Sequence, residues 1–417
     1  MSAEQTAPAP QTSFGPFAFG GQADPYPLYT AMRSGKRELR LGPFEVFLLS
    51  RYDDVLSAFK RPEIFSSAAF RESRPEFLAM RGATPAQIEQ FKEVMLTAVP
   101  TVLNSDPPEH GRYRGILNRG FTPREIGRIE SRIREIAKSL VDDLLASEGP
   151  VDLVSRLTVP LPVTVIAELL GVDRAHHADF KRWSDAFVNQ MGRAGQAIEA
   201  TLRVMGEFND YFASAIERRR REPKDDLISQ LVHAETSEGR LSPRELLAFT
   251  RLLLVAGNET TTNLVGNAVI ALLNHPDQLA RLRAEPGLVP DAVEEALRYD
   301  PPVQGLPRSV AKDVEVGGEK IPAGARAMLM IGSANRDPER WRDPDRFDVE
   351  RDTTGHLGFG FGIHFCLGSH LARLESRVAL EAIVTRLHDL ELAGEIERNP
   401  NPILRGPSRL PVTFARG

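Results

Sequence analysis

The longest regular pattern in the 417-residue sequence predicts a single helix over about residues 243–274. It begins with a capping box, Ser242 to Glu245, with proline at the first helical position. The apolar pattern then continues to about Asn274, before Pro276. Roughly 32 residues at ~1.5 Å rise per residue span about 48 Å, which is enough to cross the whole molecule. The sequence therefore predicts one unusually long helix.

The middle of this helix contains residues that a buried helix normally avoids. Residues 256–262, Ala-Gly-Asn-Glu-Thr-Thr-Thr, interrupt an otherwise apolar run. Glycine and repeated threonine lower helix propensity, and a threonine hydroxyl can hydrogen-bond to the carbonyl four residues earlier. Such violations of local preference are typical of functional sites. A helix that is merely kinked is the alternative interpretation.

The only cysteine of the chain, Cys366, lies in a glycine-rich loop between Gly358 and Gly368. Backbone without Cβ atoms can turn sharply and lie close to a flat object. A helical pattern follows the cysteine, and the N–H groups and dipole of a helix N-terminus favour a thiolate, the form that binds metal. The simpler interpretation of a lone cysteine is a buried, inert residue. The dinucleotide motif G-x-G-x-x-G does not fit, because its third glycine is missing.

The composition excludes several classes of protein. A formal net charge of −5 argues against general nucleic-acid binding, which usually requires a basic balance. One cysteine excludes an intramolecular disulfide framework and fits a reducing cytosol. No apolar run reaches the roughly 18 to 20 residues that span a bilayer, and the N-terminus lacks a signal-peptide pattern. We therefore predict a soluble, cytoplasmic protein that contacts no membrane.

The remaining patterns predict helices together with small sheets. Residues 14–67 and 303–331 alternate short apolar runs with turn residues and predict strands, whereas residues 125–149 and 174–221 are mostly amphipathic helices. We expect a mainly α protein with small β-sheets, of the α+β class. Residues 1–12, rich in Ala, Pro, Gln and Ser, are predicted to form a disordered leader before a single domain, residues 13–417.

The pattern Phe-Gly-x-Gly-x-His-x-Cys-x-Gly over residues 359–368 is similar, position by position, to the haem-binding signature of the cytochrome P-450 family. The resemblance continues, with further motifs in the family's order, from Asp53 to Phe414. It implies the cytochrome P-450 fold, in which the long central helix crosses over the haem. It also implies haem b as cofactor, with the Cys366 thiolate as the axial ligand of the iron.

The resemblance carries over to further cofactor contacts. His110 and Arg114 lie at i and i+4 in a helix that we expect Asp106 to cap, and they match positions that contact a haem propionate. Arg308 matches a second propionate-binding arginine, and a cation facing a carboxylate is physically sensible. The residues expected to contact the cofactor are His110, Arg114, Ala256, Arg308, Phe359, Gly360, His364, Cys366 and Gly368.

Residues 256–262 resemble the oxygen-binding segment of the family, with Glu259 in the acid position and Thr260 in the alcohol position. Both are expected to be catalytic: Thr260 would hydrogen-bond to O2, and Glu259 would pass protons from solvent. The implied reaction inserts one oxygen atom from O2 into a C–H bond of a substrate. Because the sequence holds no flavin, NAD or iron–sulfur motif, a separate ferredoxin or flavodoxin-type donor would supply the electrons to a protein expected to be a monomer.

The resemblance also predicts a mostly apolar wall facing the substrate. This wall is expected to comprise Leu252, Val255, Ala256, Gln304, Leu306, Ile403 and Leu404. The apolar segment 66–105 would add further contacts. A hydrophobic small molecule such as a fatty acid, terpenoid, steroid or polyketide would fit, and the sequence does not choose among them.

A motif Glu295-x-x-Arg298 on a predicted helix resembles the buried structural pair of the family, which Arg346 is expected to join. Alone, such a pair at i and i+3 is a common surface ion pair.

Three other functions compete with the monooxygenase. A peroxide-driven peroxygenase would replace the Glu259 and Thr260 pair, and a haem-binding sensor without turnover would not need it. A cysteine-nucleophile hydrolase would leave the glycine loop without a role.

Overall fold

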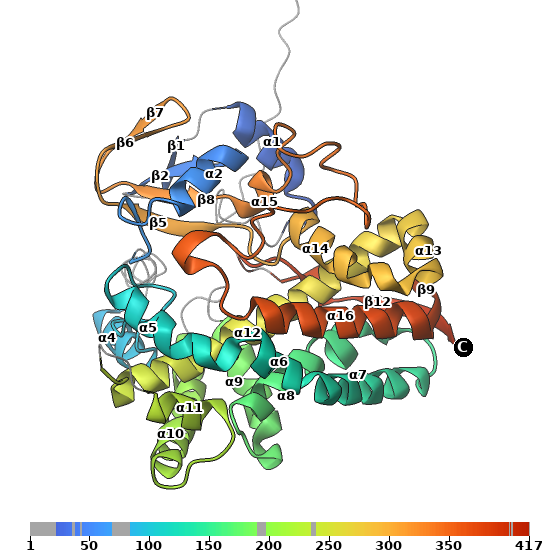
Figure 1. The fold of residues 1–417 in the computed structure, drawn as a ribbon, viewed down its shortest axis with the longest axis horizontal. Helices are drawn as coiled ribbons and strands as arrows, with labels where there is room; N and C mark the ends of the chain where they lie inside the picture. The colour runs from blue at the N-terminus through green and yellow to red at the C-terminus, as the bar shows by residue number, and fades with distance from the viewer. Residues whose placement is uncertain are drawn as a thin grey trace, which may run out of the picture.

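The computed structural model describes residues 22–35, 38–41, 44–68, 84–189, 197–234, 239–399, 401 and 403–416 (Figure 1). The predicted leader, residues 1–12, lies outside this set, as does most of the first half of segment 66–105. In Figure 1 the main sheet lies at the upper left with helices α1 and α2, and helices α7–α11 lie at the bottom. Across the described ranges, none of the helices combines the length and apolarity that a membrane crossing requires.

Helix α12 (Pro243–Asn274) has the bounds that the sequence predicts. The Ser242 hydroxyl accepts a hydrogen bond from the Glu245 N–H at 3.3 Å, and the Glu245 carboxylate accepts from the Ser242 N–H at 2.7 Å. The predicted capping box is therefore confirmed. Residues 261–272 are all buried, which is typical of a helix in the middle of a protein.

The other α-helices of the described ranges follow in chain order. They are α1 (Tyr26–Ser34), α2 (Tyr52–Phe59), α4 (Pro85–Val94), α5 (Glu109–Leu117), α6 (Pro123–Arg128), α7 (Glu130–Leu145), α8 (Pro160–Leu169), α9 (His177–Asn189), α10 (Ala197–Arg221), α11 (Leu227–His233), α13 (Pro276–Ala284), α14 (Val289–Tyr299), α15 (Ile331–Ala334) and α16 (Ser369–Arg386). Helix α14 shows why these segments pack. Its buried residues Val289, Ala292, Val293, Ala296 and Leu297 recur at helical spacing and form one apolar stripe.

Five strands form the main sheet, and all of them come from the two segments predicted to be β-rich. Their order is β1 (Glu38–Leu41), β2 (Phe44–Leu49), β8 (Arg326–Leu329), β5 (Leu306–Val310) and β3 (Phe65–Ser66). Strands β2 and β8 are parallel, whereas the other neighbours are antiparallel. One face of this sheet packs on α2, because Phe47, Leu49 and Leu329 share a buried cluster with Val55 and Phe59.

Three smaller sheets complete the described structure. Strand β6 (Val314–Val316) pairs with β7 (Glu319–Ile321), and β10 (Glu397–Arg398) pairs with β11 (Pro407–Arg409). Strand β12 (Pro411–Arg416) lies between β4 (Val151–Asp152) and β9 (Leu387–Leu392). The β10–β11 hairpin brings the C-terminal part of the chain back to the long helix.

Glu295 and Arg298 form an ion pair in which both side chains are 0% exposed. The guanidinium donates to both carboxylate oxygens at 2.7 Å. The prediction for Arg346 is wrong: its side chain is 59% exposed and lies 3.5 Å from Asp277, and only its backbone carbonyl accepts a bond from Arg298. Arg351 joins the pair instead, with its Nε 3.2 Å from Glu295 Oε1. The turn at 344–346 offers carbonyl oxygens to a buried cation, so a cationic side chain there points outward.

Candidate active site

The loop before α16 adopts a backbone that only glycine adopts easily. Gly360 and Gly362 have φ angles of +71° and +70°, in the left-handed region. A Cβ on Gly358 would lie 2.6 Å from the carbonyl oxygen of Leu297, so the loop approaches α14 too closely for a side chain. The N–H of Cys366 donates to the Phe359 carbonyl at 2.9 Å and closes the loop. These contacts fix where the cysteine lies.

Cys366 lies three residues before the first residue of α16. Burial raises the pKa of its thiol, while the N–H of Gly368 and the charges of Arg114 and Arg373 oppose this. Without a bound metal, desolvation therefore opposes the thiolate that the helix N-terminus is expected to favour. A metal cation bound at the sulfur would reverse the balance, since a coordinating thiol loses its proton outright.

Basic side chains from three parts of the chain gather beside this loop. The rings of His110 on α5 and His364 in the loop lie 4.4 Å apart between centroids. Arg114 donates to the Phe365 carbonyl at 2.7 Å. Arg308 on β5 is 4% exposed. Burial lowers the pKa of Arg308 to about 10, so this side chain stays charged at neutral pH.

Both imidazoles in this basic cluster are shifted toward the neutral form. Burial and then the charges of Arg308, His110 and Arg114 lower the pKa of His364 to about 3. Burial and then Arg114 lower the pKa of His110. His110 Nε2 is buried and has no hydrogen-bond partner among the described residues. A buried ring nitrogen without a partner, next to the buried guanidinium of Arg308, fits an anionic group such as a carboxylate.

Asp106 is placed differently from the prediction. It does not cap α5, whose N-cap residue is Pro108 without a side-chain bond. Its carboxylate instead accepts from the Ser66 hydroxyl at 2.5 Å and from the Ser67 N–H at 2.9 Å. Because Ser67 is also within 2.9 Å of His364 Nε2, Asp106 ties the β3 end of the main sheet to the basic cluster.

The unusual segment of α12 exposes small and polar groups on a helix that is otherwise largely buried. Ala256 is exposed, and Glu259 and Thr260 are partly exposed. The Thr260 hydroxyl donates to the Ala256 carbonyl at 2.6 Å, the i−4 bond that the sequence suggested. Glu259 Oε1 accepts from Asn399 at 2.9 Å and from Asn263 at 3.3 Å. The alcohol is therefore bonded within its own helix, and the acid is held by the amide groups of Asn263 and Asn399.

Most residues of the predicted apolar wall are partly exposed. These are Leu252, Val255, Leu306, Ile403 and Leu404. Leu404 pairs with Val303, which joins the end of the β10–β11 hairpin to the chain just before β5. Phe77, Leu78 and Met80, in segment 66–105, lie outside the described residues.

The geometry argues against Gln304 as part of this wall. Its side chain is 0% exposed. The amide oxygen accepts from the Tyr29 hydroxyl at 2.8 Å, and the amide nitrogen donates to the Pro301 carbonyl at 2.7 Å. The amide is therefore used inside the protein, and the remaining wall is apolar.

Comparison with known proteins identifies the family. The family model described as Cytochrome P450 matches residues 163–413. The chain is 41% identical over 421 residues to the cytochrome P450 monooxygenase PikC of Streptomyces venezuelae, covering 99% of this chain and 96% of that protein. The chain is a cytochrome P450. It is also 41% identical to the vitamin D(3) 25-hydroxylase of Pseudonocardia autotrophica, with 94% of each chain covered.

A solved structure gives the same answer for the fold. Cytochrome P450 CYP109Q5 from Chondromyces apiculatus superimposes with a TM-score of 0.83 at 42% identity, covering 94% of this chain and 96% of that one. The fold is therefore the P450 fold, as expected, and the protein is a P450 monooxygenase. P450 enzymes use a haem held by a cysteine thiolate, together with O2. The unpartnered His110 nitrogen, the buried Arg308 and the closed Cys366 loop fit a haem with its propionates.

Sequence reasoning missed the ion pair that anchors the cysteine loop to α14. Arg373 on α16 donates to Glu294 at 2.6 and 2.8 Å, and its guanidinium lies 4.6 Å from the centre of the Phe359 ring. His356 also contacts Glu294, at 3.1 Å. Although burial alone would raise it, the bonds to Arg373 and His356 hold the pKa of Glu294 at about 2.

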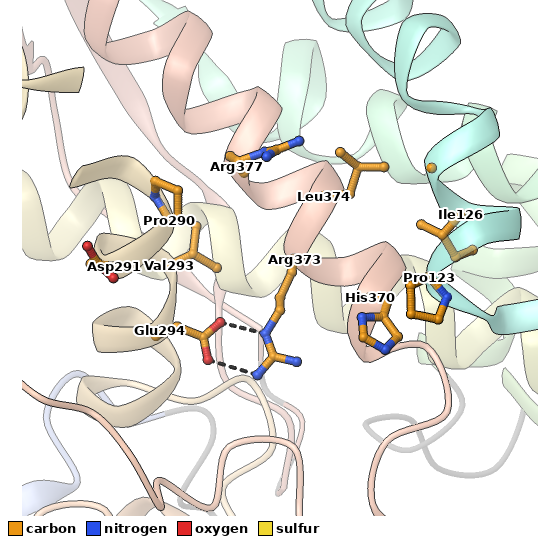
Figure 2. Close-up of a pocket in the computed structure, with 11 residues that line it drawn as sticks. Pro123, Ile126, Pro290, Asp291, Val293, Glu294, His370, Arg373, Leu374 and Arg377 are labelled. Atoms are coloured by element: carbon orange, nitrogen blue, oxygen red, sulfur yellow. Dashed lines mark hydrogen bonds and ion pairs between the residues drawn. The ribbon is translucent and has the colours of Figure 1, made fainter. Parts of the chain in front are cut away.

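A pocket of about 350 Å³ lies beside this ion pair, between α6, α14 and α16 (Figure 2). Figure 2 shows Arg373 and Glu294 joined by two hydrogen bonds, with His370 and Leu374 on the same helix as Arg373. None of the predicted wall residues lines this pocket. It is therefore separate from the proposed substrate wall.

Proposed function

We propose that this P450 hydroxylates an apolar small molecule, with haem b ligated by the Cys366 thiolate. The observation that carries the proposal is the position of Cys366. It lies in a loop with two left-handed glycines, directly beside a buried basic cluster that includes an unpartnered histidine nitrogen. When bound, the haem supplies the activation of O2, and a thiolate ligand favours O–O cleavage.

The residues proposed to hold the haem act in three ways. Cys366 supplies the thiolate, while Phe359, Gly360 and Gly368 form the loop beneath it. Ala256 on α12 leaves room for the macrocycle because its side chain is one methyl group. The basic side chains would bind the propionates; these are His110, Arg114, Arg308 and His364.

Glu259 and Thr260 are proposed to handle protons. The Thr260 hydroxyl can turn from the Ala256 carbonyl, to which it donates at 2.6 Å, and donate instead to oxygen bound beside α12. The Glu259 carboxylate, held by Asn263 and Asn399, would take a proton from solvent and pass it on to Thr260. The two residues thus move protons across an otherwise apolar pocket.

The substrate is proposed to be an apolar molecule such as a fatty acid, terpenoid, steroid or polyketide. Leu252, Val255, Leu306, Ile403 and Leu404 would form the wall, and removal of Gln304 from it leaves no amide to recognise a polar group. The similarity to a vitamin D(3) 25-hydroxylase supports a bulky hydrophobic substrate. Bacterial P450 enzymes generally take electrons from a ferredoxin, and we propose a ferredoxin or flavodoxin-type donor here.

Labelled dioxygen tests the reaction directly. The holoenzyme would be reconstituted with a ferredoxin and its reductase, and steroid, terpenoid and fatty-acid candidates would first be screened by the haem spin-state shift. A substrate that binds should yield a product carrying one oxygen atom from 18O2. A product whose oxygen comes from water, or turnover that is as fast with hydrogen peroxide alone, would contradict the proposal.

Replacing Thr260 by alanine should uncouple electron use from product formation. The variant should keep haem and substrate binding, because the side chain is small and its bond lies within the helix. Product formed per electron should fall by roughly tenfold or more, with the electrons recovered as hydrogen peroxide. Thr385 makes the same 2.6 Å i−4 bond on the exposed part of α16, so Thr385→Ala is the matched control. Unchanged coupling in Thr260→Ala would refute the proton role.

Replacing Arg308 by alanine should weaken haem retention. A charge-assisted hydrogen bond to a propionate would be lost, so haem should bind roughly 10- to 100-fold more weakly. The measurement is the rate of haem transfer from the holoprotein to a haem acceptor such as apomyoglobin. Lys320, an exposed cation on β7 in the same region, serves as the control through Lys320→Ala. Equal haem loss from both variants would remove Arg308 from the haem site.

A further inference from the structure

The β10–β11 hairpin lies directly against α12, next to the proposed proton-handling residues. A Cβ on Gly406 would lie 2.0 Å from Asn263 Oδ1, and a Cβ on Gly266 would lie 2.6 Å from Pro407 Cγ. Glycine is therefore required on both sides, since the Asn263 side chain packs on the hairpin backbone at Gly406 and the Pro407 ring packs on the helix backbone at Gly266. A movement of the hairpin would therefore displace atoms that pack against this part of α12.

An asparagine on the hairpin holds the proposed proton-handling acid. Asn399 follows β10, and its Nδ2 donates to Glu259 Oε1 at 2.9 Å. The N–H of Asn399 donates to the Gly406 carbonyl at 3.2 Å, which fixes the backbone from which the side chain projects. Asn263, on α12 itself, donates to the same carboxylate oxygen at 3.3 Å. Glu259 is thus oriented by one amide from its own helix and one from the hairpin.

A second asparagine continues this contact toward the end of the hairpin. The N–H of Asn401 donates to Asn399 Oδ1 at 3.2 Å. Asn401 Oδ1 in turn accepts from the N–H groups of Ile403 and Leu404, at 3.0 and 2.9 Å. Asn401 is 2% exposed. The planar amide of Asn399 therefore donates to Glu259 at one end and accepts from Asn401 at the other.

The far end of this chain of contacts is the proposed substrate wall. The side chains of Ile403 and Leu404 are partly exposed. Their backbone is held by the N–H of Gln304, which donates to the Ile403 carbonyl at 2.8 Å, and by the pairing of Leu404 with Val303. The backbone N–H groups of two wall residues are therefore connected to the carboxylate of Glu259 by hydrogen bonds that are joined through the covalent bonds of Asn401 and the amide of Asn399.

We propose that Asn399 and Asn401 couple contact of substrate with Ile403 and Leu404 to the orientation of Glu259. This inference rests on the proposed function and makes the two asparagines positioning residues. A substrate that packs on the hairpin turn shifts the N–H groups that Asn401 accepts from, and the shift reaches Glu259 through the amide of Asn399. Proton supply is then best when the wall is occupied by a substrate that fits it, so poorly fitting molecules waste electrons.

The variant Asn399→Asp separates the two ends of the amide. It keeps an oxygen acceptor for Asn401 but replaces the donor to Glu259 by a second oxygen, and two carboxylates at this distance repel one another. Product per electron should fall about fivefold or more, and the solvent deuterium isotope effect on product formation should rise, because proton transfer becomes slower. Substrate affinity, measured by spin-state titration, should change by less than about twofold, because Asn399 lies outside the wall.

The control is on the same hairpin. Arg409→Ala removes an exposed ion pair with Glu397, 3.4 Å long, and touches neither asparagine. It should leave the coupling ratio and the isotope effect at the values of the wild type. Loss of product with an unchanged isotope effect in Asn399→Asp would assign Asn399 a merely structural role and overturn the proposal.

A cycle of variants tests the path to the wall. Leu404→Ala should lower product per electron in the wild type but have little further effect in the Asn399→Ala background, because the path is already cut. Additive losses would contradict the proposed coupling through Asn399 and Asn401.

A second cycle, with Glu259→Gln and Asn399→Ala, measures the urea midpoint of the holoprotein and needs no turnover. The double variant should shift the midpoint by less than the sum of the single shifts, and additive shifts would exclude the bond.

The outcome also distinguishes this inference from the proposed function. A wild type that makes no oxygenated product with any bound candidate substrate contradicts the proposed function. If the wild type is active and the Asn399 variants behave like Arg409→Ala, only the proposed coupling through Asn399 and Asn401 is contradicted.

Discussion

Replacing Cys366 by serine should abolish oxygenation of substrate and remove the thiolate spectrum of the haem. A hydroxyl at this position remains protonated at neutral pH and is a poor ligand for haem iron, so the electron-rich ligand that favours O–O cleavage is lost. Product formation should fall below detection, which makes this the largest effect expected. The measurements are the absorption spectrum, the haem content and the rate of product formation in the reconstituted system.

A control on the same loop separates ligation from folding. Phe361 is 41% exposed, and the centre of its ring lies 5.6 Å from Lys60 Nζ. Phe361→Ala therefore changes the loop at an exposed side chain and leaves the cysteine in place. This variant should keep the thiolate spectrum and most of the activity. A thiolate spectrum in Cys366→Ser would refute the ligand assignment, because Cys366 is the only cysteine of the chain.

Replacing Arg298 by alanine should be the most destabilising of the substitutions considered. Arg298 and Glu295 are both 0% exposed, and Glu295 also accepts from the N–H of Asp348 at 2.9 Å. Removal of the guanidinium leaves a buried carboxylate with Arg351 as its remaining side-chain cation. Breaking a buried pair by removing one partner costs about 3–5 kcal/mol. The free energy of unfolding in urea measures this loss, with haem content recorded at each step.

Arg346 is the matched control, because sequence resemblance assigns it to the same pair and the structure does not. Its side chain is exposed, and Arg346→Ala should change the free energy of unfolding by less than about 0.5 kcal/mol. Arg346→Ala and Arg298→Ala with equal effects would show that the arrangement around Glu295 is wrong.

The features that sequence predicted well are set by neighbours along the chain. The capping box of α12 needs only Ser242 and Glu245, and the i−4 bond of Thr260 needs only its own helix. The contact between Glu295 and Arg298 follows from i and i+3 spacing on one helix, whereas its burial was implied only by the family resemblance. The cysteine loop likewise follows from its own glycines, whose left-handed backbone at Gly360 no other residue adopts easily.

The features that sequence mispredicted depend on partners far along the chain. Asp106 has the right place for an N-cap, but Ser66 and Ser67 take its carboxylate. Gln304 is close in sequence to the wall residue Leu306. Its amide oxygen, however, accepts a hydrogen bond from the hydroxyl of Tyr29 on α1, near the other end of the chain.

The same reason explains the missed contacts of Glu259. Its bond to Asn399 joins residues 140 positions apart, and no local pattern marks either as the partner of the other. Predicting long-range pairs of this kind requires the relative positions of whole helices and strands, and these positions do not follow from periodicity or capping.

The absorption spectrum of the purified protein, reduced with dithionite and exposed to carbon monoxide, tests the central claim most directly. A strongly red-shifted Soret band is expected, because a thiolate at Cys366 donates electron density to the iron. A Soret band at the position typical of histidine-ligated haem, or protein that binds no haem at all, would contradict the assignment of Cys366 and with it the roles proposed for Glu259, Thr260 and Asn399.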